Sequence, residues 1–168
     1  MEINLYDTQT TTYGPTEKYV SDSYTHIPQA IPMVLHDPLC SPEYQTKGSA
    51  GADLKVSKEC VLLPNQTLVV STGISLAIPE GFVGLLFPRS GLASRGITLA
   101  NSVGVIDSDY RGEIMVPLIN RSTDPVVLKH GDRVAQMVFL PVTQFPFVVA
   151  ENLGDTSRGS GGFGSTGV

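Results

Sequence analysis

The chain has 168 residues, of which 41% are hydrophobic, and this size fits one domain with its own core. The formal net charge of −5 excludes a general basic surface for nucleic acid, and no apolar run approaches the length of a transmembrane helix. No secretory pattern opens the chain, and its two cysteines, Cys40 and Cys60, lie far apart. The histidines His26, His36 and His130 have no metal-ligand spacing. We therefore expect a reduced, cytoplasmic protein without a disulfide framework or a zinc site.

Residues 1–30 are rich in Thr and Tyr and poor in branched aliphatic side chains, without strand or helix periodicity. This composition predicts an N-terminal extension that is at most partly ordered, and any protein partner of it is unknown. We expect one folded domain over residues 31–154. Residues 155–168 are rich in Gly, Ser and Thr and are expected to form a flexible C-terminal arm.

From residue 31 onward, short apolar runs alternate with turn residues, which is typical of an all-β barrel or sandwich. Two runs, Cys60–Leu63 and Thr67–Val70, flank the turn residues Pro64-Asn65-Gln66 and are predicted to form a hairpin. Further strands are expected at Ile74–Ile78, Phe82–Phe87, Ile114–Ile119, Val126–Leu128, Val134–Leu140 and Phe145–Ala150.

The strand expected at Ile114–Ile119 is apolar on both faces, so it belongs in the core or against another subunit. Pro117 lies inside it and cannot donate a ladder hydrogen bond. This proline favours an edge or interface strand over a central one.

One segment breaks the strand pattern and predicts a helix of one to two turns. It starts at Ser90, a residue type that caps helices, and ends near Gly96, a residue type that terminates them.

Five stretches combine Gly with Ser, Arg, Asp or Gln, which is unusual for a purely structural β protein. Glycine lets backbone amides approach a ligand closely, and arginine offers a forked charge to phosphate oxygens. Each stretch alone is compatible with an ordinary turn. The five are Gly48–Leu54, Pro88–Leu92, Asn101–Gly112, Gly131–Gln136 and Arg158–Ser165.

The stretch Asn101–Gly112 is the most informative, because an apolar run leads directly into Asp107, Asp109 and Tyr110. A carboxylate at the end of a buried strand can act as a base toward water. Alternatively, Asp107 closes a turn through its own side chain while Tyr110 fills the core. The residues alone leave both interpretations open.

In order and spacing, the five stretches together resemble the motifs of the trimeric deoxyuridine triphosphatase (dUTPase) family. The likeness runs from about Ile31 to Val168. It implies a distorted jelly-roll β-barrel with one short helix, a homotrimer with shared active sites, and an arm that closes over them. It also implies Mg²⁺-dependent hydrolysis of dUTP to dUMP and diphosphate, which supplies dUMP for thymidylate synthesis and limits uracil in DNA.

The resemblance assigns roles to the matching positions. Asp107 would activate the attacking water, and Asp53 would reach the Mg²⁺ through a water molecule, the ion being held mainly by the triphosphate. Uracil and deoxyribose would be bound by Asn101, Gly104, Val105, Ile106, Tyr110 and Phe163. The phosphates would be bound by Arg89, Ser90, Gly91, Gln136, Arg158, Gly164, Ser165 and Thr166.

Two alternatives belong to different classes of protein. A dCTP deaminase-like enzyme resembles this pattern but needs a glutamate where Pro117 stands, and proline cannot relay a proton. An interaction protein switched by dUTP would use the pocket without catalysis, although all five motifs are intact.

Overall fold

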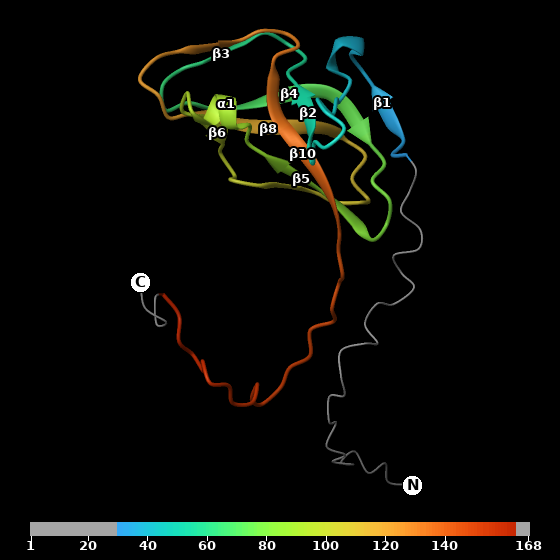
Figure 1. The fold of residues 1–168 in the computed structure, drawn as a ribbon, viewed down its shortest axis with the longest axis vertical. Helices are drawn as coiled ribbons and strands as arrows, with labels where there is room; N and C mark the ends of the chain where they lie inside the picture. The colour runs from blue at the N-terminus through green and yellow to red at the C-terminus, as the bar shows by residue number, and fades with distance from the viewer. Residues whose placement is uncertain (1–29, 164–168) are drawn as a thin grey trace.

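The computed structural model describes residues 30–163, and their regular structure is almost entirely β (Figure 1). One sheet has the order β1 (Met33–Leu35), β4 (Thr67–Leu76), β8 (Glu113–Asn120) and β6 (Ile97–Leu99). The second has the order β2 (Ala52–Lys55), β10 (Arg133–Pro141), β5 (Phe82–Phe87) and β7 (Gly104–Ile106). A small third sheet pairs β3 (Cys60–Leu62) with β9 (Val126–Leu128), and the helical segments are η2 (Pro38–Cys40) and α1 (Ser90–Ala93).

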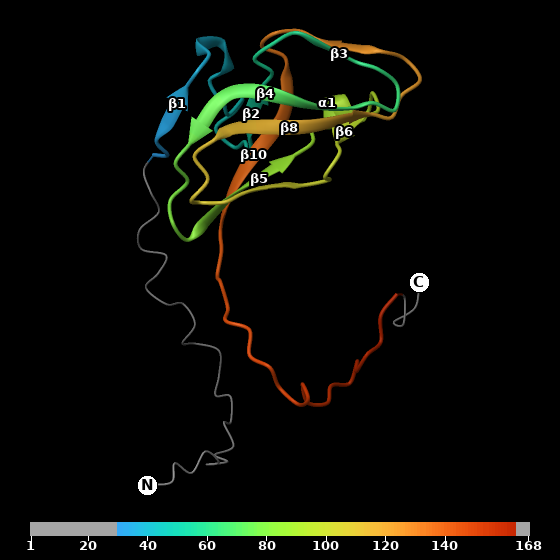
Figure 2. The ribbon, with the colours of Figure 1, turned by 180° about the vertical axis from the view of Figure 1, so that it is seen from behind.

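The two larger sheets share one hydrophobic core, and every strand pair is antiparallel (Figure 2). Alternate residues of β6, β8 and β9 are buried in this core, as the period of a strand predicts. The predicted all-β jelly-roll architecture with one short helix is confirmed, although its hydrogen bonds form separate sheets rather than a closed barrel. Between residues 30 and 163, no helix is long and apolar enough to cross a membrane. The largest fully buried side chains include Leu54, Ile74, Leu86, Ile97, Ile114, Leu118 and Met137.

Four predicted strands are confirmed. Phe82–Phe87 matches β5 and Val126–Leu128 matches β9, while Ile114–Ile119 lies within β8 and Val134–Leu140 lies within β10. The run Ile74–Ile78 overlaps the end of β4, which continues from Thr67 as a single strand. Apolar runs with turn residues on both sides located these strands, although the run Phe145–Ala150 did not form one.

The predicted hairpin between Cys60–Leu63 and Thr67–Val70 is wrong. The turn exists, since Gln66 N–H donates to the Leu63 carbonyl at 3.0 Å, but β3 pairs with β9 and β4 pairs with β8. Asn120, at the end of β8, accepts from Asn65 N–H at 2.7 Å and donates its own N–H to Gln66 at 3.1 Å. The turn is therefore bound to a third strand, which separates the two strands that flank it.

The prediction of an edge strand around Pro117 is also wrong, because β8 has β4 on one side and β6 on the other. β6 pairs only with Leu118–Asn120, so Pro117 lies just beyond that ladder. Its carbonyl accepts from Ala100 N–H at 2.8 Å. The local end of β6 explains how a proline fits an inner strand.

The strand predicted at Phe145–Ala150 is absent from the described chain. These residues are extended and exposed, and Phe147 and Val149 are fully exposed. They begin the C-terminal arm, which leaves the β body (Figures 1 and 2). A strand needs a partner for its backbone groups, and the single chain offers none here. The predicted N-terminal extension, residues 1–29, lies outside the described residues.

The helix predicted near Ser90 is present as α1, but Ser90 is its first residue rather than its cap. Arg89 occupies the N-cap position and makes no capping hydrogen bond with its side chain. Gly96 has a φ of 82° after the helix, as expected for a terminating glycine.

Glu113, the first residue of β8, stabilises a bulge in the neighbouring strand β4. The register of the two strands shifts between Ser71 and Ser75, and Gly73 has a φ of 68° there. The Glu113 carboxylate accepts from Gly73 N–H at 2.7 Å and from the Ser71 hydroxyl. The pKa of Glu113 is lowered, mainly because its carboxylate accepts the hydrogen bond from Ser71. Burial raises this pKa, and the hydrogen bond from the Gly73 amide lowers it further.

We expect Glu113→Gln to lower the free energy of unfolding by about 1–2 kcal/mol at pH 7, because a charged acceptor is lost. The folded pKa lies below the unfolded one, so this stabilisation is complete above the unfolded pKa and is lost as pH falls through the folded pKa. Urea unfolding followed by circular dichroism from pH 7 down to about pH 2.5, below the lowered folded pKa, measures both effects. Glu59→Gln, at an exposed site, is the control. A deficit that stays constant across this range would contradict the assignment.

Candidate functional site

Apart from those of the arm, the predicted site residues lie on or beside one sheet, β2-β10-β5-β7. Gln136 of β10 lies opposite Asp53 of β2 on one side and Phe87 of β5 on the other. Directly after Phe87 come the loop and helix α1 that carry Arg89. The sheet therefore aligns three of the five motifs in one row.

Asp53 is the buried charge of this row, with only 6% of its surface exposed. Its Oδ1 accepts from Arg89 Nε at 2.7 Å, and its Oδ2 accepts from Arg133 Nη1 at 3.2 Å. A buried carboxylate is stable when it is paired and hydrogen-bonded in this way. One negative charge faces two positive ones, so the cluster keeps an excess positive charge next to α1.

Gln136 ties the same loop to the sheet. Its Nε2 donates to the Pro88 carbonyl at 3.0 Å. A Cβ on Gly51 would lie 2.8 Å from Gln136 Oε1, so the glycine leaves the space that this amide occupies. Gln136 thus positions the residue immediately before Arg89.

Around α1, the structure leaves groups available for a ligand. Ser90 and Gly91 are exposed, and a Cβ on Gly91 would meet nothing within 4 Å. Within residues 30–163, Arg89 Nη2 has no hydrogen-bond partner, whereas Nε and Nη1 bind Asp53 and the Arg133 carbonyl. The arginine is anchored on one side and available on the other.

The fourth strand of the sheet, β7, leads to Asp107. Gly104 packs so closely on Leu86 that a Cβ there would lie 3.0 Å from two of its atoms. After β7 the chain turns, and Tyr110 N–H donates to the Asp107 carbonyl at 3.2 Å. Among the described residues, no hydrogen bond reaches the Asp107 carboxylate, which is exposed. The turn therefore closes through the backbone, and the carboxylate is available for chemistry.

Tyr110 does not fill the core, since 42% of its surface is exposed. Its hydroxyl donates to the Glu113 carbonyl at 2.9 Å. A Cβ on Gly112 would clash with that hydroxyl oxygen, so Gly112 makes room for the ring. The ring is fixed at both its backbone and its hydroxyl, and presents an exposed face.

A hollow lies beside Asp107, lined partly by Phe82, Val105, Asp109 and Arg111. Asn101 is exposed in the turn before β7, and Val103 N–H donates to its carbonyl at 2.7 Å. Neither Arg111 nor Arg133 was among the predicted site residues, although both stand inside the motifs. No feature of the sequence marks Arg133 as a site residue, and only its contact with Asp53 in the structure indicates this role.

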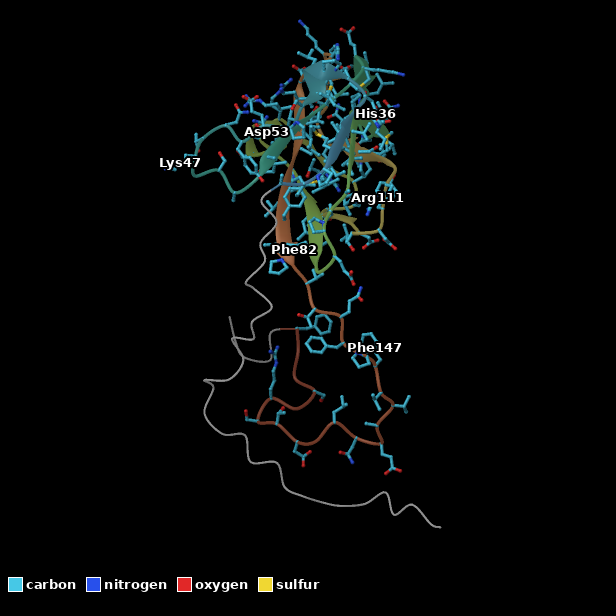
Figure 3. All side chains as sticks on the ribbon, turned by 90° about the vertical axis from the view of Figure 1, so that its right-hand side faces the viewer. His36, Lys47, Asp53, Phe82, Arg111 and Phe147 are labelled. Carbon is cyan, nitrogen blue, oxygen red and sulfur yellow. The ribbon has the colours of Figure 1, made fainter. Side chains whose placement is uncertain are left out.

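The arm residues lie apart from the rest of the site. Phe163 is fully exposed, and Arg158 Nε donates to the Gly161 carbonyl at 2.9 Å, within the arm itself. Phe147, at the start of the arm, stands away from the β body in Figure 3. The predicted phosphate ligands Gly164, Ser165 and Thr166 lie outside the described residues.

Within one chain, the two halves of the site are separated. Ile106, just before Asp107, pairs with Gly84 at the start of β5, whereas Arg89 follows the end of that strand. The strand from Gly84 to Arg89 spans roughly 17 Å at the usual rise per residue. Asp53 and Arg111, which mark the two halves, lie on different sides of the β body in Figure 3.

Comparisons with known proteins agree on one family. The family model described as dUTPase matches residues 37–167. Deoxyuridine 5'-triphosphate nucleotidohydrolase of Desulfitobacterium hafniense is 54% identical over 76% of this chain and 87% of its own length. The protein of the same name from Thermobifida fusca is 48% identical over 75% of this chain and 72% of its own length. A dUTPase of Staphylococcus bacteriophage 80alpha, solved with dUpNHpp, has a TM-score of 0.78 at 26% identity over 84% of this chain and 100% of its own.

We expect Asp53→Asn to lower the free energy of unfolding by roughly 2–4 kcal/mol, because two arginines lose the charge that pairs them in a buried place. Glu43→Gln is the matched control, since it removes another ion pair from the same strand: Glu43 is paired with Lys55 at 3.6 Å but is 61% exposed. Its loss is expected to be below about 1 kcal/mol. Urea unfolding measures both variants, and equal losses would contradict the central role of Asp53.

Proposed function

Because this chain belongs to the dUTPase family and hydrolyses dUTP to dUMP, we propose that Asp107 orients and deprotonates the water that attacks the α-phosphorus. The observation that carries this proposal is the state of its carboxylate. It is exposed beside a hollow at the end of β7 and accepts no hydrogen bond from residues 30–163. A base must be free to accept the proton of a water molecule, and attack on phosphorus needs positioning more than covalent chemistry.

We propose that the turn around β7 selects the base and the sugar. The fixed ring of Tyr110 supports the deoxyribose and leaves no space for a 2′-hydroxyl. Uracil is recognised by Asn101 and the backbone of residues 104–106, with Phe163 covering its face. Gly104 packs closely on Leu86 and Gly112 on the ring of Tyr110, and this close packing fixes the turn and supports selection by shape.

The phosphates are proposed to bind at the other half of the site. Arg89, Ser90 and Gly91 offer an anchored guanidinium, a hydroxyl and an open backbone, and Gln136 keeps their loop in place. The excess positive charge around Asp53 supports the binding of an anion. The arm adds the remaining proposed ligands, Arg158, Gly164, Ser165 and Thr166.

dUTPases are metal-dependent, and we propose Mg²⁺ as the ion. Asp53 is the one carboxylate in the row with Gln136 and Arg89, and both its oxygens already accept guanidinium N–H groups, so it is no direct ligand cage. Each oxygen keeps a second lone pair, which fits a hydrogen bond from a water on an ion that the triphosphate holds. When bound, the ion neutralises phosphate charge.

We further propose that three copies of the chain assemble and share their sites. The separation of Asp107 from Arg89 within one chain supports this, because both must reach the same triphosphate. The exposed apolar start of the arm, including Phe147 and Val149, supports it too, since a neighbouring copy would give these side chains a surface to pack on.

We also propose that the folded domain is residues 31–154 and that residues 1–30 are an N-terminal extension. The enzyme is proposed to act in the cytoplasm without binding nucleic acid.

Asp107→Asn is expected to bind dUTP but to lose turnover by on the order of 10²-fold or more, since the amide cannot take a proton. A diphosphate-release assay with Mg²⁺ across dUTP, dTTP, dCTP and UTP measures turnover and selectivity together. Asp109→Asn changes a neighbouring carboxylate in the same turn and is the control. Near-normal turnover of Asp107→Asn would reject the role of Asp107 as the base. A separate assay for ammonia tests the alternative activity, since ammonia release from dCTP would support deamination.

Mixing two inactive variants tests the sharing of sites. Arg158→Ala is suitable because Arg158 lies on the arm, whereas Arg89 also pairs with buried Asp53. Refolding Asp107→Asn together with Arg158→Ala in equal amounts should restore activity at about a quarter of the sites, where one copy gives Asp107 and another gives Arg158. Each variant refolded alone is the control. If both residues come from one chain, every site keeps one defect and no activity returns.

A further inference from the structure

Outside the site described above, one cluster of chemically active side chains joins two distant parts of the chain. Asp37 is the N-cap of η2, Cys40 is its last residue, and His130 lies in the turn between β9 and β10. One ligand atom of each, a carboxylate oxygen, the sulfur and a ring nitrogen, lies within 4.8 Å of the other two. No other such group of three occurs among residues 30–163.

Tight packing around the cluster fixes its backbone. A Cβ on Gly73 of β4 would lie 3.0 Å from Asp37 Cβ and 3.2 Å from Cys40 Cβ. Likewise, a Cβ on Gly131 would lie 3.0 Å from Leu39 Cδ2, and both glycines have positive φ angles. β4 and the β9–β10 turn therefore approach η2 as closely as backbone allows, which brings the three side chains together.

The side chains combine a rigid part with an adjustable one. Asp37 Oδ1 accepts from Leu39 N–H at 3.0 Å, so the carboxylate is oriented, and its Oδ2 contacts His130 Nε2 at 2.6 Å. Cys40 is completely buried, and its thiol makes only a weak contact of 3.6 Å with the Val56 carbonyl. The His130 side chain is 44% exposed, so the imidazole can shift toward solvent.

The donor set matches one class of ion. Sulfur and imidazole nitrogen favour zinc and similar divalent transition metals, whereas Mg²⁺ and Ca²⁺ prefer oxygen. Around a tetrahedral zinc, ligand atoms lie about 3.3–3.7 Å apart. The Asp37–His130 contact of 2.6 Å would open by about 0.7 Å to reach this spacing. The thiol lies within 4.8 Å of the other two ligand atoms and would move inward by at most about 1.5 Å. A thiolate and a carboxylate balance the charge of a divalent ion, and solvent beside His130 supplies water as a fourth ligand.

We propose that Asp37, Cys40 and His130 form a binding site for a divalent transition metal of the zinc class, separate from the metal that accompanies the triphosphate. Binding replaces the thiol proton of Cys40 by the ion, neutral His130 binds through Nε2 with its own proton on Nδ1, and no electrons are transferred. The ion would join η2 to the turn that leads into β10. That strand begins at Arg133, the partner of Asp53, so the site would stabilise the edge of the phosphate-binding half.

The test uses the full-length, reduced protein without other metals, titrated with Co²⁺ as a spectroscopic substitute for zinc. Tetrahedral coordination with a thiolate gives intense visible bands and a sulfur-to-cobalt charge-transfer band, which added Zn²⁺ should remove. Zn²⁺ should also raise the melting temperature by several degrees. Cys40→Ser should abolish the charge-transfer band, and His130→Ala should weaken the apparent affinity at least about tenfold.

Two matched variants separate this site from binding elsewhere. Cys60→Ser removes the other cysteine, and His36→Ala removes the other described histidine, which contacts Ser75. Both should keep the Co²⁺ spectrum. Because Cys40 is buried and its serine variant can fail to fold, His130→Ala in an exposed turn provides an independent measurement. A spectrum without the charge-transfer band, or one that survives both Cys40→Ser and His130→Ala, would overturn the proposal. None of these residues belongs to the proposed catalytic machinery, so dUTP hydrolysis with Mg²⁺ should change little.

Discussion

The buried carboxylate of Asp53 is the constraint on which the rest of the proposed phosphate-binding half depends. A charge that is 6% exposed must be paired, and its two partners are Arg89, at the N-cap of α1 after β5, and Arg133, at the start of β10. Satisfying this one carboxylate therefore fixes three elements relative to one another. The same contacts orient the guanidinium of Arg89 while leaving part of it available, so stability and ligand binding use one set of atoms.

A second constraint is the geometry of a strand. Gly84 of β5 pairs with Ile106 of β7, next to Asp107, whereas Arg89 follows the opposite end of β5. The same strand therefore contributes to both halves of the site and separates them. A strand cannot fold back within this distance, and a small substrate cannot bridge both ends. The proposed assembly of several copies would bring the two halves together without altering the sheet. The extended arm has the same origin, since Phe147 finds no surface on its own chain.

Much of the fold could be predicted from the sequence because local patterns determine it. The apolar run Phe82–Phe87 between turn residues located β5, and Gly96 located the end of α1. The wrong predictions concerned which strands pair with one another. Pro64-Asn65-Gln66 forms the expected turn, yet hydrogen bonds to Asn120, more than fifty residues later, draw its flanking strands apart. Pro117 fits an inner strand only because β6 ends beside it, and no local pattern carries that information.

The same distinction applies to the candidate site: residues within one motif could be proposed from the sequence, whereas contacts between distant segments could not. Asp107 and Tyr110 were predictable because a contiguous motif holds both the carboxylate and the ring. The part played by Arg133 depends on Asp53, eighty residues earlier, and only the register of β2 with β10 brings them together. His130 lacks any metal-ligand spacing in the sequence, although the fold places it 2.6 Å from Asp37. Spacing along the chain detects sites built within one turn or one element. Sites built across a sheet or between turns become visible only when backbone packing, here the close approach that Gly73 and Gly131 allow, is known.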